Sequence, residues 1–512
     1  MKKLIINAFM KTTPKAPLRN LGVNQQEDAV STCNTGVDFK ESSERGEDCG
    51  RCQIQLSRFA RLALLVLTGV AVFPQNAKAV PSFARQTGMS CITCHTDFPQ
   101  LTDFGRQFKL GGYTLGGGDT NLPPFAIMLQ PSFTETKKGQ PGGAAPHYRD
   151  NSNFALNQAS IFYSGRLFGP YAESLFGSET ASFLNKFGTF FQATYDGVGK
   201  AFAWDNAELR FADSTTIGGH PLNYGFYLNN NPSMQDPWNS TPVWGFPFSG
   251  SSLGPTPGAS TLIDGGLSQQ VIGLGGYAML SNSLYLDIAA YHTLSATFQR
   301  AMGVDPADDA QVPGLAPYWR LAYTKSSGNQ SFEVGLFGLA ANTYPGRDRS
   351  AGKDRILDWG FDSQYQISLG KNDITTTASW IYERQHWNAS QELGGAANNT
   401  DHLWTAKATI DYLYDKTYGG AISYFWVDGS NDPLLHSESL RGSPESNGLV
   451  LQLNYIPFNK SGGPSFWPKS NVKLSAQYVI YNKFDGAHSN YDGTGRNASD
   501  NNTLYLEAWI TF

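Results

Sequence analysis

Apolar and polar residues alternate along much of the chain between Phe125 and Phe512. The last segment shows the pattern clearly, because every second residue from Leu504 to Phe512 is Leu, Ala, Ile or Phe. Successive side chains of a β-strand point to opposite faces, so each alternating segment predicts a strand with one apolar face. Alternation over about ten residues, interrupted by turn residues, is typical of transmembrane β-barrels.

Sixteen such segments occur, an even number that suits a single-chain bacterial barrel. We therefore expect an all-β fold, a transmembrane antiparallel β-barrel of about 16 strands formed by residues 119–512. The predicted strands lie near Phe125–Phe133, Ala159–Leu167, Phe187–Tyr195, Ala207–Phe211, Leu222–Leu228, Val271–Met279, Leu284–Ala290, Trp319–Tyr323, Phe332–Ala340, Leu357–Ile367, Ile374–Tyr382, Trp404–Tyr414, Tyr418–Trp426, Leu449–Tyr455, Val472–Ile480 and Leu504–Phe512.

The connections between these strands alternate in length, and the longest runs from Asn229 to Gly266. It contains the stretch Asn229–Asn239, rich in Asn, Pro and Ser. One interpretation is an ordered loop folded at or into the mouth of the barrel. The other is an exposed loop stabilised by Asx turns.

A short apolar run, Phe59–Phe73, follows Arg58 and precedes the small-residue box Ala77-Lys78-Ala79. This arrangement predicts a secretory signal peptide at residues 58–79, cleaved so that the mature protein begins at Val80. A membrane-spanning helix would need about 20 apolar residues. Residues 1–79 are thus expected to be a leader, and export of a β-barrel predicts the outer membrane of a Gram-negative bacterium.

Composition supports this view. The chain holds 54 Gly, 32 Phe and 24 Tyr, only 16% charged residues and a net charge of −5, which fits a barrel with aromatic girdles in contact with outer-membrane lipid. The absence of a basic surplus argues against a nucleic-acid partner. No Ser/His/Asp spacing indicates hydrolysis, so no catalytic residue is predicted.

Cys91-Ile92-Thr93-Cys94-His95 forms a C-x-x-C-H box directly after the leader. In such a box the two thiols attach to the vinyl groups of a haem and the histidine is the proximal iron ligand. Cys91 and Cys94 are the only cysteines after the leader. The alternatives are a coincidental match or a redox-active cysteine pair. The box predicts one covalent haem c, bound by Cys91, Cys94 and His95.

The flanks of the box also fit a haem segment at residues 80–118. Thr96 to Pro99 predicts the start of a helix, with Pro at its first position. Its apolar stripe, which could lie on the porphyrin, consists of Phe98, Leu101, Phe104 and Phe108. The cations that could pair with haem propionates are Arg85, Arg106 and Lys109, or else they form a solvated face.

The segment Pro81–His95, with Phe98-Pro99, Phe104-Gly105-Arg106, Phe108-Lys109 and Gly112-Tyr113, resembles the fused monohaem cytochrome–porins of iron-oxidising bacteria. The resemblance is specific over about Pro81 to Leu115 and general over the barrel. It implies an outer-membrane electron conduit, a possible Fe(II)-oxidising cytochrome, that takes electrons from an extracellular donor such as Fe(II) and passes them to a periplasmic cytochrome. Two alternatives stay open: a passive porin with a structural or regulatory haem segment, and an electron outlet to an extracellular acceptor.

About forty residues are few for an independent core. We therefore expect the haem segment to pack inside the barrel lumen, whose wall could supply the second iron ligand. Met128 is the candidate, because lipid-facing Phe125 and Ile127 would turn it inward. A thioether ligand raises the potential of a haem, as an iron-oxidising system needs. The predicted metal ligands are thus His95 and Met128. The rival distal ligands are His147 and His220, whereas Met89 is too close to the box.

Overall fold

The computed structural model describes residues 82–116, 123–306, 310–460, 463–464 and 470–512. The predicted leader, its signal peptide and the cleavage site before Val80 lie outside these residues.

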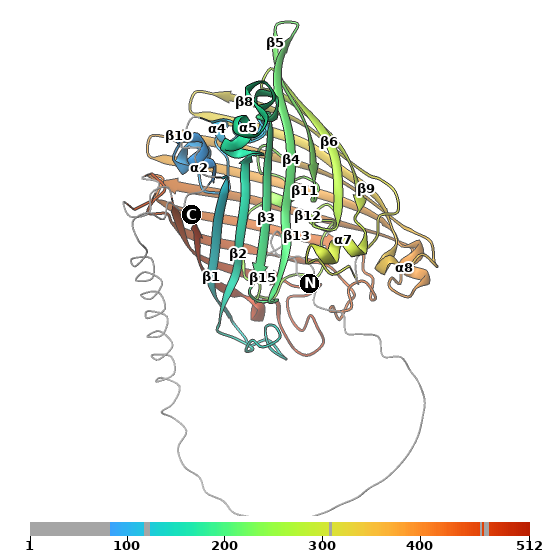
Figure 1. The fold of residues 1–512 in the computed structure, drawn as a ribbon. Helices are drawn as coiled ribbons and strands as arrows, with labels where there is room; N and C mark the ends of the chain where they lie inside the picture. Colours follow the sequence, from blue (N-terminus) through green and yellow to red (C-terminus); the bar gives the residue numbers. More distant parts are fainter. Residues whose placement is uncertain (1–81, 117–122, 307–309, 461–462, 465–469) are drawn as a thin grey trace, which may run out of the picture. The chain divides into compact units, whose positions relative to one another are not determined.

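Sixteen antiparallel strands close into one barrel, in which β16 pairs with β1 (Figure 1). All sixteen predicted strands are confirmed. Most extend beyond the predicted bounds, because barrel strands continue through polar residues outside the apolar band. The strands are β1 Phe125–Thr136, β2 Asn153–Arg166, β3 Phe187–Asp196, β4 Ala201–Ile217, β5 His220–Asn229, β6 Val271–Leu280, β7 Leu284–Thr293, β8 Ala316–Ser327, β9 Gln330–Thr343, β10 Asp354–Leu369, β11 Asn372–His386, β12 Thr400–Tyr414, β13 Tyr418–Gly429, β14 Ser446–Tyr455, β15 Asn471–Lys483 and β16 Thr503–Thr511.

The barrel wall alternates as the sequence predicts. On β1, Phe125 and Ile127 are 49% and 37% exposed on the outer face, whereas Met128 and Gln130 are buried on the inner face. A closed barrel satisfies its backbone hydrogen bonds within itself, which is required in a bilayer. This is the architecture of barrels that span the outer membrane of Gram-negative bacteria. In the described part of the chain, every helix is too short or too polar to cross a membrane.

The two ends of the barrel differ in their connections. At one end, the turns at 218–219, 281–283, 328–329, 370–371 and 415–417 have two or three residues. At the other end, the connections include 137–152, 230–270, 294–315, 430–445 and 484–502. Outer-membrane barrels place their short turns in the periplasm and their long loops outside. The short-turn end is therefore the periplasmic end, and the chain enters β1 from it.

The helices among the described residues are short. They are α2 Ser82–Thr87, α3 Cys91–Cys94, α4 Asp103–Leu110, α5 Ala172–Phe176, α6 Ser178–Leu184, α7 Ala296–Ala301 and α8 Asn388–Glu392, with 3-10 turns η1 Gly169–Tyr171, η2 Pro242–Trp244, η3 Pro345–Arg347 and η4 Ala498–Asn501. Figure 1 shows α2 and α4, in blue, at the same end of the barrel as the C-terminus.

The predicted helix start at Thr96 to Pro99 is wrong, because α4 begins at Asp103. The hydroxyl of Thr102 accepts a hydrogen bond from the amide of Gly105 at 3.1 Å and so caps the helix. The residues before it form a turn instead, in which the amide of Gln100 donates to the oxygen of Asp97 at 2.7 Å.

The segment that carries the C-x-x-C-H box lies in the lumen, as expected. Arg106 donates to Ser331 and Gln364 on the inner faces of β9 and β10, at 3.1 Å in each case. Asp97 pairs with Lys473 of β15 at 2.8 Å, and both side chains are buried. These partners lie more than 200 residues away in sequence, so the barrel wall supplies the surroundings that so short a segment cannot build itself.

The longest connection, loop 230–270 between β5 and β6, also folds into the lumen. Asp236 lies 3.3 Å from Arg320, which is bonded as well to Asp362 at 2.8 Å and to Glu333 at 3.1 Å. All four side chains are buried. A buried charge is tolerated only when it is paired and hydrogen-bonded, as here. The interpretation of an ordered loop inside the barrel is confirmed, and that of an exposed loop is wrong.

Candidate functional site

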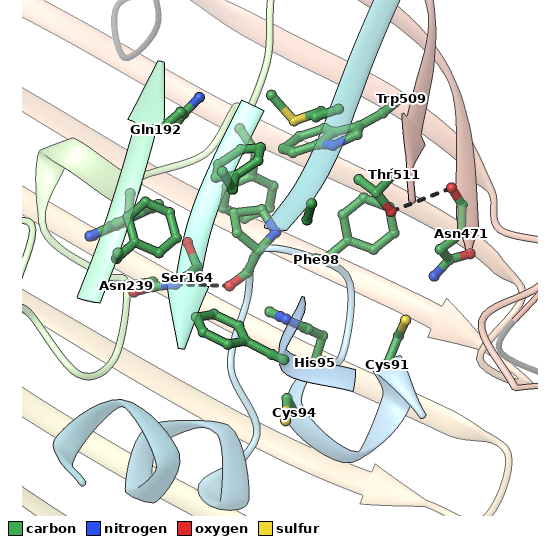
Figure 2. A pocket seen from close by; sticks show the side chains of 18 of the residues that line it. Cys91, Cys94, His95, Phe98, Ser164, Gln192, Asn239, Asn471, Trp509 and Thr511 are labelled. Atoms are coloured by element: carbon green, nitrogen blue, oxygen red, sulfur yellow. Dashed lines mark hydrogen bonds between the residues drawn. The ribbon is translucent and has the colours of Figure 1, made fainter. Parts of the chain in front are cut away.

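A cavity of about 320 Å³ lies in the lumen between the N-terminal segment, loop 230–270 and the periplasmic halves of several strands. Its lining includes Cys91, Cys94 and His95 from the segment. Figure 2 shows these three residues on one short turn. Phe98 of the same segment and Trp509 of the barrel wall also line the cavity. The box therefore faces a cavity inside the barrel, close to the periplasmic end.

The two cysteines occupy the first and last positions of α3, one helical turn. The amide of His95 donates to the oxygen of Cys91 at 2.9 Å, and both thiols are free of disulfide bonds. Burial raises the pKa of Cys94 to about 11. Redox-active cysteine pairs have lowered pKa values and a reactive thiolate. The raised pKa of Cys94 is therefore unlike that of a redox-active pair.

The imidazole of His95 is held in one orientation. Its Nδ1 lies 3.1 Å from the backbone oxygen of Gln100. Burial lowers the pKa of this histidine to about 4, so the ring is neutral at neutral pH. A neutral ring that donates from Nδ1 presents an unprotonated Nε2, and metal-bound histidines are commonly fixed by such a bond to a backbone carbonyl. The role of His95 as an iron ligand stays a prediction.

Helix α4 packs against the backbone of the C-x-x-C-H box at Gly105, where there is no room for a larger residue. A Cβ on Gly105 would lie 2.2 Å from the backbone oxygen of Cys94. Beyond this contact, Phe98, Leu101 and Phe108 line the cavity. Three of the four residues of the predicted apolar stripe therefore face the space where a porphyrin would lie. Phe104 is not in the lining.

Met128 lies on the inner face of β1, 5% exposed, and lines the same cavity as the box. Its sulfur lies 3.8 Å from Nε2 of Gln130. Met89 also lines the cavity. The rival histidines do not: His147 is exposed on the long connection 137–152, and His220 is exposed at a periplasmic turn. The structure thus brings the predicted ligands Met128 and His95 into the lining of one cavity.

The three predicted propionate partners have protein partners in the structure. Arg85 donates to the backbone oxygen of Phe125 at 3.0 Å, and Arg106 is bonded to Asp103 and the wall. Lys109 donates to the oxygens of Met234 and Asp236 at 2.8 and 2.6 Å, and it is the one of the three cations that lines the cavity. All three are buried, so the solvated-face interpretation is wrong. A propionate role for Arg85 and Arg106 stays a prediction.

Several lining residues escaped the sequence-based prediction. Trp509 and Thr511 of β16, Asn471 of β15 and Trp244 of loop 230–270 all border the cavity. The ring of Trp509 packs edge-on against Phe98 at 5.3 Å. The alternation of apolar and polar residues along β16 predicts that Trp509 and Thr511 face the lumen, so these two residues could have been found from the sequence. No sequence signal places the loop residues.

No family model matches the chain, and no curated protein matches it. Solved outer-membrane barrels are similar to it at low identity. OmpF of Salmonella typhi, in complex with daunomycin, is 13% identical, with 76% of this chain and 97% of that chain covered and a TM-score of 0.40. An anion-selective porin from Comamonas acidovorans is 8% identical, with 76% and 98% covered and a TM-score of 0.40. The channel DcaP of Acinetobacter baumannii is 10% identical, with 76% and 96% covered and a TM-score of 0.39.

Proposed function

We propose that this outer-membrane barrel carries one covalent c-type haem and conducts electrons from an extracellular donor, Fe(II), to a periplasmic cytochrome. The observation that carries the proposal is the cavity whose lining contains both the C-x-x-C-H box and Met128. The resemblance of the segment around the box to the monohaem cytochrome–porins supports the same function.

The residues of the cavity fit a haem. Cys91 and Cys94 would hold it covalently, and His95 and Met128 would supply ligands to its iron. The bound haem would supply one-electron exchange. Rings of Phe98, Phe108 and Trp244 line the cavity and would exclude water from the porphyrin. Low polarity around a haem and a thioether ligand both act on its potential.

The position of the cavity also fits this direction of transfer. The box lies near the periplasmic end, where a soluble cytochrome could approach. The donor's electron would have to enter from the long-loop end, past loop 230–270. The rate of electron tunnelling falls steeply with distance. A haem inside the lumen is therefore better placed to accept an electron from an external donor than a haem in the periplasm. The ferric product, which is poorly soluble, would then stay outside the cell.

The second candidate is a channel for small solutes, and the barrel itself favours it. A closed sixteen-stranded barrel is the architecture of the general porins, whose lumen is wide enough for an aqueous passage. In that case the N-terminal segment would have a structural or regulatory role. An electron outlet to an external acceptor would use the same parts in the opposite direction.

The test is a redox titration of the purified protein combined with addition of Fe(II). We expect a single haem with a positive midpoint potential that Fe(II) reduces, because a His/Met ligand pair raises the potential. A haem that stays oxidised in excess Fe(II), despite a midpoint potential near or above that of the donor, would contradict iron oxidation. A strongly negative potential would favour the outlet.

A further inference from the structure

The connection between β2 and β3, residues 167–186, is unlike the turns around it. It lies at the periplasmic end, where the other fully described turns have two or three residues. It forms two helices, α5 and α6, joined at Gly177. Gly177 has a φ of +78°, a conformation that favours glycine, and this lets the second helix fold back at once. We call α5 and α6 together the helical hairpin.

The helical hairpin contacts the outer wall of the barrel. Phe190 lines the lumen cavity, so Phe187, three positions earlier on the same strand, points outward. Phe187 is paired with Phe211 of β4, and their rings are 5.1 Å apart. The ring of Phe183 from α6 lies 5.5 Å from Phe187 and 6.2 Å from Phe211. Helix α6 therefore rests on the lipid-facing surface, not over the mouth of the lumen.

The helical hairpin leaves large apolar side chains uncovered. Leu175 is 63% exposed, Phe183 55% and Phe176 44%. The small residues Ala172 and Ala181 are the buried ones, at 3% each. An apolar surface of this kind, unsheltered by protein, marks a contact with a partner or a membrane. Between residues 167 and 185 the only charged side chains are Glu173 and Glu179.

We propose that the helical hairpin is embedded in the interface of the periplasmic leaflet, with Leu175, Phe176 and Phe183 among the acyl chains and Glu173 and Glu179 at the headgroups. The occupant is lipid because the exposed side chains continue the lipid-facing wall through Phe187 and Phe211. Amphipathic helices that lie in the membrane plane bury their apolar face in this way. The hairpin would fix the depth and tilt of the barrel at the end where the haem segment enters. This proposal is independent of the haem.

Spin labels at single cysteines test it in the full-length mature protein reconstituted into phosphatidylcholine vesicles. The variants are Leu175→Cys and Phe183→Cys, with Glu179→Cys as the matched control on the same hairpin. Unsubstituted protein labelled in parallel measures any reaction of Cys91 and Cys94. All three replaced side chains are exposed, so the barrel is expected to fold, which heat-dependent migration on gels verifies.

Labels at 175 and 183 are expected to collide several-fold more often with dissolved oxygen than with a water-soluble nickel complex, and the label at 179 should show the reverse preference. Equal access of nickel to all three positions would overturn the proposal. Labels that are in water in pure lipid vesicles but shielded in native membranes would also overturn it, and would indicate a protein partner instead.

Discussion

Haem staining of the denatured protein is expected to disappear completely when Cys91 and Cys94 are both replaced by alanine. The two thiols are the predicted covalent links, and α3 presents them to one cavity. Without them no bond would hold the haem through denaturing electrophoresis. The barrel itself is expected to form, since its sixteen strands pair without any contribution from the cysteines. Heat-dependent migration measures barrel formation in the same sample.

The matched control for this loss is Thr93→Ala. It changes the box between the two cysteines but keeps their spacing and the histidine. The stain should stay at the level of the unsubstituted protein. Equal staining of the Cys91→Ala/Cys94→Ala protein would refute covalent attachment. Loss of the stain in Thr93→Ala as well, with the barrel intact, would show that staining depends on the local fold and not on the thiols.

Met128→Ala is expected to lower the midpoint potential of the haem and to remove the sulfur-to-iron charge-transfer band. Met128 lies on the barrel wall and lines the same cavity as the box. Axial ligands set haem potentials over a range of about 0.8 V, and exchange of a thioether for a weaker or harder ligand should shift the potential by on the order of 0.1 V. Spectroelectrochemistry of the two proteins measures both quantities.

Met89→Ala is the control, because Met89 lines the same cavity but lies two residues before Cys91. It should keep the charge-transfer band and nearly the same potential. If Met128→Ala keeps the band and Met89→Ala loses it, the ligand is Met89. If both keep it, another sulfur supplies the band and the assignment to Met128 is wrong. If the unsubstituted protein shows no such band, the ligand is not a sulfur, and Lys109, which also lines the cavity, becomes the next residue to test.

The sequence predicted the barrel well because alternation is a local signal. One face of each strand contacts lipid and the other faces the lumen, so apolar and polar residues alternate along the strand. The same parity placed Met128 inward. The alternation of β16 likewise predicts that Trp509 points inward, although Trp509 was not among the predicted site residues. The strand ends were missed where the extensions are polar, as at Thr324 to Ser327 of β8, because such residues show no apolar face in the sequence.

The remainder depends on contacts between residues far apart in the chain. Arg106 is hydrogen-bonded to Ser331 and Gln364, which lie 225 and 258 positions away in the sequence. No periodic pattern in the sequence predicts these contacts. The entry of loop 230–270 into the lumen depends on the contact of Asp236 with Arg320. Helix α4 begins at Asp103 because Thr102 caps it, whereas the preceding residues form a turn next to the buried ion pair of Asp97 and Lys473.

The most direct test of electron conduction uses vesicles that contain the barrel in one orientation, Fe(II) outside and an oxidised, membrane-impermeant cytochrome trapped inside. The trapped cytochrome is expected to be reduced by vesicles with the haem-loaded protein and not by vesicles with the Cys91→Ala/Cys94→Ala protein. Reduction at the same rate in both would mean that Fe(II) itself passes through the barrel, as a channel predicts. No reduction in either, although Fe(II) reduces the haem, would contradict conduction across the membrane.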